Sequence, residues 1–298
     1  MLHLGMNLFN RFKKKNTIIT AIEPVTEDNQ LQNFPEMLMT KLLFSGKPKL
    51  NADQILAELK KHINNIDHSF SVSSLIFSFP DYPVQLADAT LPAQLNILIP
   101  DRDEAGIGLP DTAFTQNWHW PEANQVAQNC QYEILITDLM SRSLPYKQRV
   151  NLFMDFLAAV IRVTQPSAVY TFHGDKILNP ASITGLWETD KVQTLYALCN
   201  VRLFNISNDP QKRELLMDTM GMHALGLPDF QIRFSTFNEN EIANLLWTYA
   251  YHIYEYGDII EEGDTMEGLA GSKWKCVKEV SLVAPERMVI NMIPDEQA

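Results

Sequence analysis

His173 and Asp175 flank a single glycine directly after the apolar run 168–172. A histidine and a carboxylate at this spacing can share acid–base work on a substrate. If the run is a strand of an open parallel sheet, both residues lie at its carboxyl end, where such sheets bind ligands. The alternative, which we favour, is a turn in which Gly174 supplies backbone freedom and the polar groups face water.

Trp118, His119 and Trp120 form a second candidate binding site, followed directly by Pro121. Two large amphipathic rings two residues apart would point the same way in an extended segment. Such a pair could serve as a platform for a ligand or as an anchor for a protein partner. The structural alternative, a loop fastened over the core by its tryptophans, is the interpretation we favour.

The segment 220–231, Met-Gly-Met-His-Ala-Leu-Gly-Leu-Pro-Asp-Phe-Gln, is the third candidate. Gly221 and Gly226, followed by Leu-Pro-Asp, indicate a backbone that passes close to another element and then turns sharply. Asp229 is expected to cap neighbouring amides, and His223 is expected to act as a buried donor. A structural role is therefore favoured for this segment too.

Motifs that carry their own mechanism are missing from the sequence. There is no phosphate-binding glycine loop, no nucleophile elbow and no His-Glu-x-x-His pair. None of the seven histidines pairs with another at metal-ligand spacing, although ligands from distant segments could still converge. Cys130, Cys199 and Cys276 are far apart and are expected to be buried thiols. The sequence therefore predicts no catalytic residue, no cofactor and no metal.

The charge of the chain is strongly acidic, with 24 Lys and Arg against 36 Asp and Glu and a net charge of −12. Such a surface repels phosphate backbones, which argues against nucleic acid as a partner, and it suits a basic protein. An acidic run near the C-terminus is expected to be solvated, with docking of a basic partner as the sharper alternative. This run contains Glu255, Asp258, Glu261, Glu262, Asp264 and Glu267.

The N-terminal segment carries its positive charges, at 11–15, after a short apolar stretch. A secretory signal has the opposite order, and no apolar run approaches the ~20 residues that span a bilayer. We therefore expect a cytoplasmic protein without a membrane span. A frayed or loosely docked terminus is favoured over a membrane-surface helix, which would place Leu4, Leu8, Phe9 and Phe12 on one side.

The elements that position these residues follow from periodicity and punctuation. An apolar stripe predicts a long helix after Pro145, between strands at 132–137 and 168–172. Strand, helix and strand in this order predict a right-handed crossover joining a parallel pair. Further helices are expected after the caps Asn51 and Asn238.

Several strands are expected around these helices. The runs 70–79 and 84–99 are predicted strands joined by a Pro-Asp-Tyr-Pro turn. The runs 274–283 and 288–292 are predicted to close the chain as a hairpin. Strands at 215–222 and 230–234 should flank the Gly-Leu-Pro-Asp turn.

The predicted fold class is α+β, with mixed β-sheets and helices packed on one face. Residues 1–35 are expected to be a partly flexible lead-in, and 36–294 a single domain. Two similar halves with strand–helix–strand units, 36–140 and 141–294, are an alternative that no sequence repeat proves.

The segment 220–231 resembles the hallmark of a bacterial domain-of-unknown-function family, number 4261, which carries a similar Gly-Met/Leu-x-x-Leu-Gly-Leu-Pro-Asp/Glu stretch. Weaker pieces in the same order extend the resemblance over most of 36–292. One departure is Thr171-Phe172, where a Trp-Gly-like pair is expected. The resemblance implies fold and bacterial origin and brings no catalytic residues with it.

Two functional hypotheses follow. The first is a non-catalytic protein-binding module, such as an immunity or toxin-neutralising protein that binds a basic partner. The second is a small-ligand-binding protein or enzyme centred on His173 and Asp175, with His223 as a further member. The second requires these side chains to meet in one pocket.

Overall fold

The computed structural model describes residues 32–71, 73–100, 107–189, 195–209 and 212–294. Expectations for the lead-in before residue 32 lie outside the described residues. The chain divides into two compact units. The first unit comprises residues 35–199, and the second comprises 1–34 together with 200–298. Each unit is described by itself.

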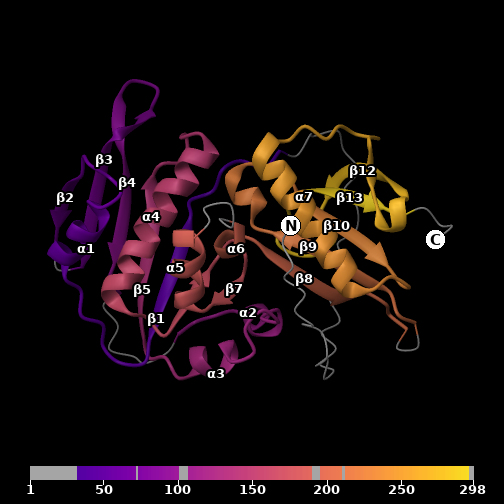
Figure 1. The fold of residues 1–298 in the computed structure, drawn as a ribbon, viewed down its shortest axis with the longest axis horizontal. Helices are drawn as coiled ribbons and strands as arrows, with labels where there is room; N and C mark the ends of the chain where they lie inside the picture. Colours follow the sequence, from indigo (N-terminus) through magenta and orange to yellow (C-terminus); the bar gives the residue numbers. More distant parts are fainter. Residues whose placement is uncertain (1–31, 72, 101–106, 190–194, 210–211, 295–298) are drawn as a thin grey trace. The chain divides into compact units, whose positions relative to one another are not determined.

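The first unit is built on a seven-stranded sheet in which every paired neighbour is antiparallel (Figure 1). Its strand order is β2-β3-β4-β5-β1-β6-β7. The strands are β1 Met39–Phe44, β2 Asp67–Phe70, β3 Ser74–Gln85, β4 Thr90–Leu98, β5 Tyr132–Met140, β6 Ala168–Thr171 and β7 Lys176–Leu178.

Successive residues of a strand point to opposite faces of the sheet. Both faces of this sheet carry apolar side chains, and helices cover each of them. Phe156 of the long helix α4 packs edge-on against Phe77 and Phe79 of β3. The short helices α2 and α3 pack over Leu43 and Tyr170, which point to the other face. The helices are α1 Ala52–Leu59, α2 Asp111–Thr115, α3 Ala123–Gln128, α4 Tyr146–Thr164, α5 Pro180–Thr189 and α6 Leu195–Leu198.

The strands on either side of α4 are not the adjacent parallel pair that was expected. β5 and β6 run in the same direction, but β1 lies between them and pairs antiparallel with both. Residues on both faces of β1 are buried, which favours a central place in the sheet. The prediction of a strand–helix–strand crossover was therefore right, and the prediction of direct pairing was wrong.

The expected turn at Pro-Asp-Tyr-Pro was also wrong, because β3 continues through it. The register with β4 shifts between Phe79 and Pro83, and the chain reverses only at Leu86, whose amide binds the carbonyl of Ala89 at 2.8 Å. β2 pairs with β3 only as far as Ser78. The prolines therefore sit where one side of β3 has no neighbour and no donor is needed.

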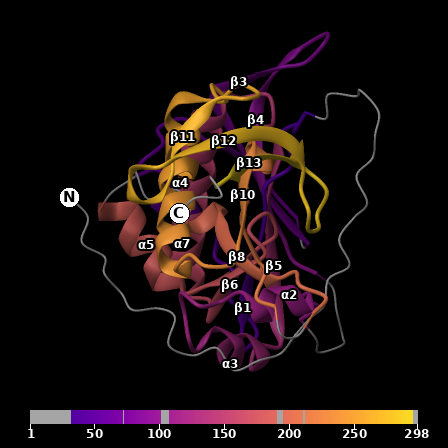
Figure 2. The same ribbon diagram turned by 90° about the vertical axis from the view of Figure 1, so that its right-hand side faces the viewer.

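The second unit contains a six-stranded mixed sheet in the order β11-β12-β13-β10-β9-β8. β10 and β13 are parallel, and the other pairs are antiparallel. The helix α7 packs against β8, β9 and β10 on one face (Figures 1 and 2). The elements are β8 Asn200–Asn205, β9 Leu215–Met220, β10 Asp229–Phe234, α7 Glu239–Tyr256, β11 Thr265–Glu267, β12 Lys273–Val280 and β13 Met288–Ile293.

Local signals placed the ends of helices correctly. Asn51 accepts the amide of Gln54 at the start of α1, and Asn238 accepts the amides of Asn240 and Glu241 at the start of α7. Gly257 ends α7 with a φ of 85°, a conformation that favours glycine.

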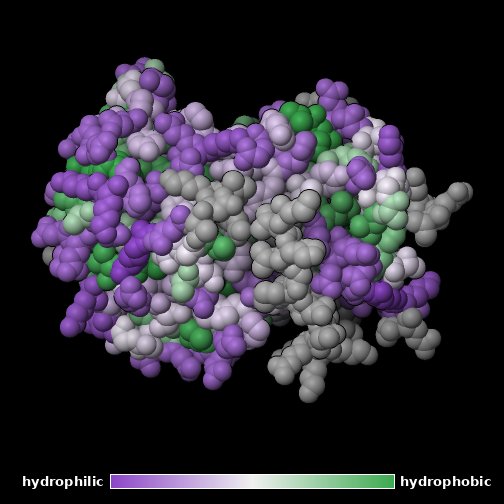
Figure 3. All heavy atoms as spheres, in the orientation of Figure 1, coloured by the Kyte–Doolittle hydropathy of each residue, from purple (hydrophilic) through white to green (hydrophobic). Residues whose placement is uncertain are grey.

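The fold class is α+β, as predicted, with two sheets and seven α-helices among the described residues. No helix within the described ranges is both long enough and apolar enough to cross a membrane. Hydrophilic residues cover most of the visible face, and hydrophobic residues show in small groups (Figure 3).

Candidate functional site

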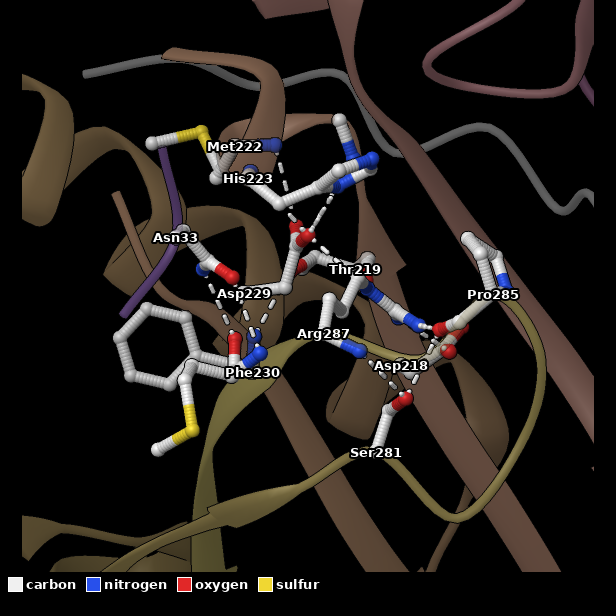
Figure 4. A network of polar contacts seen from close by, with 12 residues as sticks. Asn33, Asp218, Thr219, Met222, His223, Asp229, Phe230, Ser281, Pro285 and Arg287 are labelled. Carbon is white, nitrogen blue, oxygen red and sulfur yellow. Dashed lines mark hydrogen bonds and ion pairs between the residues drawn. The ribbon is translucent and has the colours of Figure 1, made fainter. Parts of the chain in front are cut away.

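Asp229, the first residue of β10, is the centre of a buried polar network (Figure 4). The exposed fraction of this residue is 0%. Its carboxylate accepts hydrogen bonds of 2.8 to 3.4 Å from the Thr219 hydroxyl, the backbone amides of Gly221, Met222 and His223, His223 Nδ1 and Arg287 Nε. The carboxylate therefore fastens the whole 219–223 turn to the start of β10.

Asp218 is the second buried carboxylate, and it lies between two arginines. Arg202 of β8 binds it in a bidentate manner, with Nε–Oδ1 at 2.9 Å and Nη2–Oδ2 at 2.6 Å. Arg287 reaches it through Nη2 at 2.7 Å while binding Asp229 through Nε at 3.0 Å. Two carboxylates and two guanidinium groups thus balance in charge inside the unit, with all four residues no more than 5% exposed.

The electrostatics of the network keep both kinds of charge in place. Burial by itself would raise the pKa of Asp229, but the hydrogen bond from His223 and the charge of Arg287 hold that pKa well below its usual range. Burial would lower the pKa of Arg287, but the charges of Asp218 and Asp229 raise it. Asp229 is therefore held as a carboxylate and Arg287 as a guanidinium cation.

Two glycines allow the turn that surrounds Asp229. Gly221 has a φ of 137° and Gly226 a φ of 80°, and L side chains rarely adopt either conformation. Between them, residues Met222–Leu225 form a single 3-10 turn. This is the sharp turn that the glycine spacing indicated.

Asn33 fastens the chain before the first unit onto the same region (Figure 4). Its amide nitrogen donates to the carbonyls of Leu227 at 2.8 Å and Met288 at 3.0 Å. Its amide oxygen accepts the backbone N–H of Met288 at 2.9 Å. One side chain thus joins the Leu-Pro-Asp turn to the first residue of β13.

His223 is held by the network and has one remaining chemical capacity. The hydrogen bond to Asp229 assigns its proton to Nδ1, so the neutral ring carries a lone pair on Nε2. Nε2 has no partner in the described part of the chain, and Figure 4 shows that edge of the ring turned away from Asp229. General bases and metal ligands are oriented in this way. Within the described ranges, however, His, Cys, Asp and Glu form no group of three that could hold a metal ion.

His173 and Asp175 belong to the first unit, in the turn between β6 and β7. His173 Nε2 accepts the backbone N–H of Met39 at 2.9 Å, and Asp175 Oδ1 accepts the hydroxyl of Tyr170 at 2.8 Å. β6 pairs antiparallel on both sides, so the premise of a parallel strand end was wrong. The two side chains bind different parts of the sheet, and they are buried rather than solvated.

Trp118, His119 and Trp120 lie in a turn between α2 and α3, and not in the extended segment that would align both rings. Trp120 packs on the apolar cluster under α2 and α3. The ring nitrogen Nε2 of His119 lies 2.8 Å from the carbonyl of Ile177. These contacts correspond to a loop fastened to the core.

His119 is expected to stay neutral between pH 5 and 8. Burial, together with the charge of Lys176, lowers its pKa from 6.5 to about 3. The free energy of unfolding should therefore fall as the pH drops below about 6.5, because only the unfolded chain takes up the proton. Ring chemical shifts of His119 that stay constant between pH 5 and 8 would confirm that the ring remains neutral. The urea-unfolded chain is the control. A midpoint near 6.5 in the folded protein would contradict it.

A surface depression of about 380 Å³ lies in the first unit beside the apolar cluster under α2 and α3. None of the seven predicted binding residues lines it. Its walls are Ile107, Leu109, Phe114, Ala127, Gln128, Cys130 and Gln131.

The charged residues of the network other than Asp229, namely Asp218, Arg202 and Arg287, were missed at the sequence level, although one signal was present. Asp218 is a lone charge inside the apolar run 215–220, and such a residue needs a buried counter-ion. Arg202, between Val201 and Leu203, has the same character. The pattern does not tell which charge pairs with which.

The comparisons with known proteins bear on the second unit alone. A search of curated proteins finds no match, and a search of solved structures finds none either. The family match covers residues 218–293 and is narrower than the expected 36–292. That range contains Asp218, His223, Asp229 and Arg287, and its family is described as a domain of unknown function, so the chain carries a DUF4261 domain at residues 218–293.

Proposed function

We propose that the chain is a non-catalytic, cytoplasmic protein-binding module of bacteria whose second unit binds a basic protein. The observation that carries this proposal is a contrast within that unit. The polar side chains of its buried network, apart from Nε2 of His223, bind one another inside the unit, whereas a set of exposed carboxylates lies in residues 255–267 together with two exposed apolar side chains. We call this set the acidic surface: Glu255, Tyr256, Asp258, Ile259, Glu261, Glu262, Asp264 and Glu267.

The apolar members give the acidic surface something to bury. Tyr256 is 67% exposed and Ile259 is 55% exposed, at the end of α7 and just beyond it. An interface is strongest where large side chains are covered by a partner and charges stand at the rim. The six carboxylates supply such a rim for lysines and arginines of the partner.

Part of the acidic charge is already balanced. Lys278 binds both carboxylate oxygens of Asp258, at 3.0 and 2.9 Å, and its backbone N–H binds Glu262. Lys273 and Lys275 of β12 lie opposite β11. The three lysines offset half of the six carboxylates, so an excess of negative charge remains for a partner.

A toxin-neutralising role is the finer form of this proposal. The negative charge of the acidic surface would attract a basic toxin. The bound toxin would then be unable to reach its own target. Binding is favoured over catalysis at His173 and Asp175 because each of these side chains is engaged with the sheet of the first unit.

Charge reversal at the acidic surface is expected to weaken partner binding at least about tenfold. The double variant Glu261→Lys with Glu267→Lys tests this, because neither side chain stabilises a turn of the described chain. The chain is used to isolate partners from its native host, and the affinity of each purified partner is then measured by calorimetry. The matched control is Asp88→Lys with Glu122→Lys, an equal charge change on exposed residues of the first unit.

The proposal requires a basic partner that loses affinity with the acidic-surface variant and keeps it with the control. Equal loss in both variants would indicate general electrostatics. The proposal would be refuted by a partner whose affinity is the same for both variants and the wild type. It would also be refuted if no basic partner were isolated.

A further inference from the structure

We propose that Nε2 of His223 is a phosphoryl acceptor, which takes a phosphoryl group from a phosphoramidate donor such as a phosphorylated histidine of another protein. This goes beyond the proposed function, because it gives the second unit a modification site that uses no residue of the acidic surface. Three features of the molecule support it: the orientation of the ring, the access to Nε2 and the engagement of the hydroxyls of the buried network.

The ring of His223 is held in one orientation by Asp229 (Figure 4). Nδ1 lies 2.8 Å from Oδ2 of Asp229, so the neutral ring carries its proton on Nδ1 and a lone pair on Nε2. The carboxylate is itself fixed, because it also accepts the Thr219 hydroxyl, three backbone amides and Nε of Arg287. A nucleophile whose direction is fixed before the reaction avoids much of the orientational cost of the transition state.

Nε2 of His223 reaches the surface of the described chain. It has no hydrogen-bond partner in the described ranges. Trp274 Nε1 is a buried nitrogen without a partner, and Nε2 of His223 does not belong to that group of atoms. Since the side chain is 7% exposed, the exposed part of the ring includes the nucleophilic nitrogen.

The hydroxyls of the same network are engaged elsewhere. Thr219 donates its hydroxyl proton to Asp229 at 2.9 Å. Ser281 donates its own to the carbonyl of Pro285 at 2.8 Å. In a hydrolytic triad the histidine takes its proton from such a hydroxyl, and neither of these two donates to His223. The ring nitrogen is therefore the reacting atom, rather than the base that activates one of these hydroxyls.

Phosphoryl transfer to Nε2 balances in atoms and in charge. The lone pair attacks phosphorus, the P–N bond of the donor breaks, and the protonated nitrogen of the donor leaves as a neutral amine. Nδ1 keeps its proton, so the phosphorylated ring is an imidazolium. Its positive charge forms beside the carboxylate of Asp229, which lies 2.8 Å from Nδ1 and stabilises it.

The electrostatics of the network support this step. The hydrogen bond from His223 and the charge of Arg287 hold the pKa of Asp229 well below its usual range, so a carboxylate faces the ring throughout the transfer. A carboxylate behind a histidine also raises the basicity of the ring. The sequence has no phosphate-binding glycine loop, so a donor already activated by its P–N bond suits this site better than a nucleotide.

Potassium phosphoramidate tests the acceptor directly, because this small donor phosphorylates histidines without an enzyme. We expect His223 to react at least about tenfold faster than His62, the lower end of what a carboxylate partner of a histidine supplies. His62 is the matched control, since it is exposed and has no carboxylate partner in the described ranges. His119 and His173 should stay unmodified, because their Nε2 atoms bind the backbone.

Tandem mass spectrometry of peptides kept at alkaline pH gives the rate at each histidine, and phosphorus NMR distinguishes the Nε2 isomer from the Nδ1 isomer. His223→Gln should remove the fast-reacting site, and the glutamine amide can still donate to Asp229. In urea the preference for His223 should disappear, because the unfolded chain has no carboxylate fixed behind the ring.

A rate at His223 no higher than the rate at His62 would overturn the proposal. Phosphorylation of His223 on Nδ1 would also overturn it, because this product requires the bond to Asp229 to open. A preference that persists in urea would assign the reactivity to the local sequence, and the proposed role of the fold would be wrong. Fast reaction at His223 without any basic partner in the host would refute the proposed function alone.

Discussion

Replacement of Arg287 by alanine is expected to lower the free energy of unfolding by about 3–5 kcal/mol, the range for breaking a buried ion pair. The guanidinium contacts both Asp218 and Asp229, and both carboxylates are fully buried. Removing it leaves two negative charges with only Arg202 and His223 nearby. Arg287 also donates to the carbonyls of Thr219 and Pro285, and these acceptors would lose their donor too.

Urea unfolding followed by fluorescence and by circular dichroism measures this loss. Arg233→Ala is the matched control, since Arg233 pairs with Glu214 where both side chains are exposed. Surface pairs contribute less than about 1 kcal/mol. If Arg287→Ala costs no more than this control, the network does not hold the second unit together.

The pH dependence of stability is expected to carry a large contribution from Lys176. Its Nζ donates to the carbonyls of Tyr196 at 2.9 Å and Cys199 at 3.3 Å, and lies 4.2 Å from the centre of the Tyr196 ring. Burial lowers its pKa from 10.5 to about 7. Between these two values the unfolded chain binds the proton and the folded chain does not. The free energy of unfolding therefore rises with pH across this window, by up to about 1.4 kcal/mol per pH unit.

Lys176→Met isolates this contribution, because methionine has a similar length and no charge. The difference in unfolding free energy between wild type and variant should change by about 2–3 kcal/mol from pH 7 to pH 9, in favour of the wild type. Taking the difference cancels the tyrosines and cysteines that titrate in the same range. Parallel stability curves for the two proteins would show that Lys176 stays charged in the folded state.

The parts of the fold that sequence reasoning predicted are those set by local chemistry. Asn51, Asn238 and Gly257 each act within a few residues, so their types alone mark helix ends. The place of β1 between β5 and β6 depends on contacts with strands about 90 to 130 residues away, and nothing local specifies it. The same holds for the path of β3 through its prolines, which depends on how far β2 extends.

The candidate site shows the same division. Gly221, Gly226 and Asp229 lie in one turn, and their spacing was sufficient to predict a structural role for Asp229. Its strongest counter-ion, Arg287, is 58 residues away in the sequence, beyond any local pattern. The binding-platform alternative for the tryptophan pair required an extended backbone, because side chains alternate only there, whereas Trp118 and Trp120 lie in a turn.

Arg202 and Asn33 stabilise the DUF4261 domain from outside its boundaries, and this affects which residues should vary together in related chains. Both residues lie outside 218–293, yet Arg202 neutralises Asp218 and Asn33 joins Leu227 to Met288. A fragment cut at the family boundaries would keep Asp218 and Arg287 and lose Arg202, the cation that binds Asp218 in a bidentate manner. Related chains are therefore expected to change positions 202 and 218 together, as a covarying pair that straddles the edge of the recognised domain.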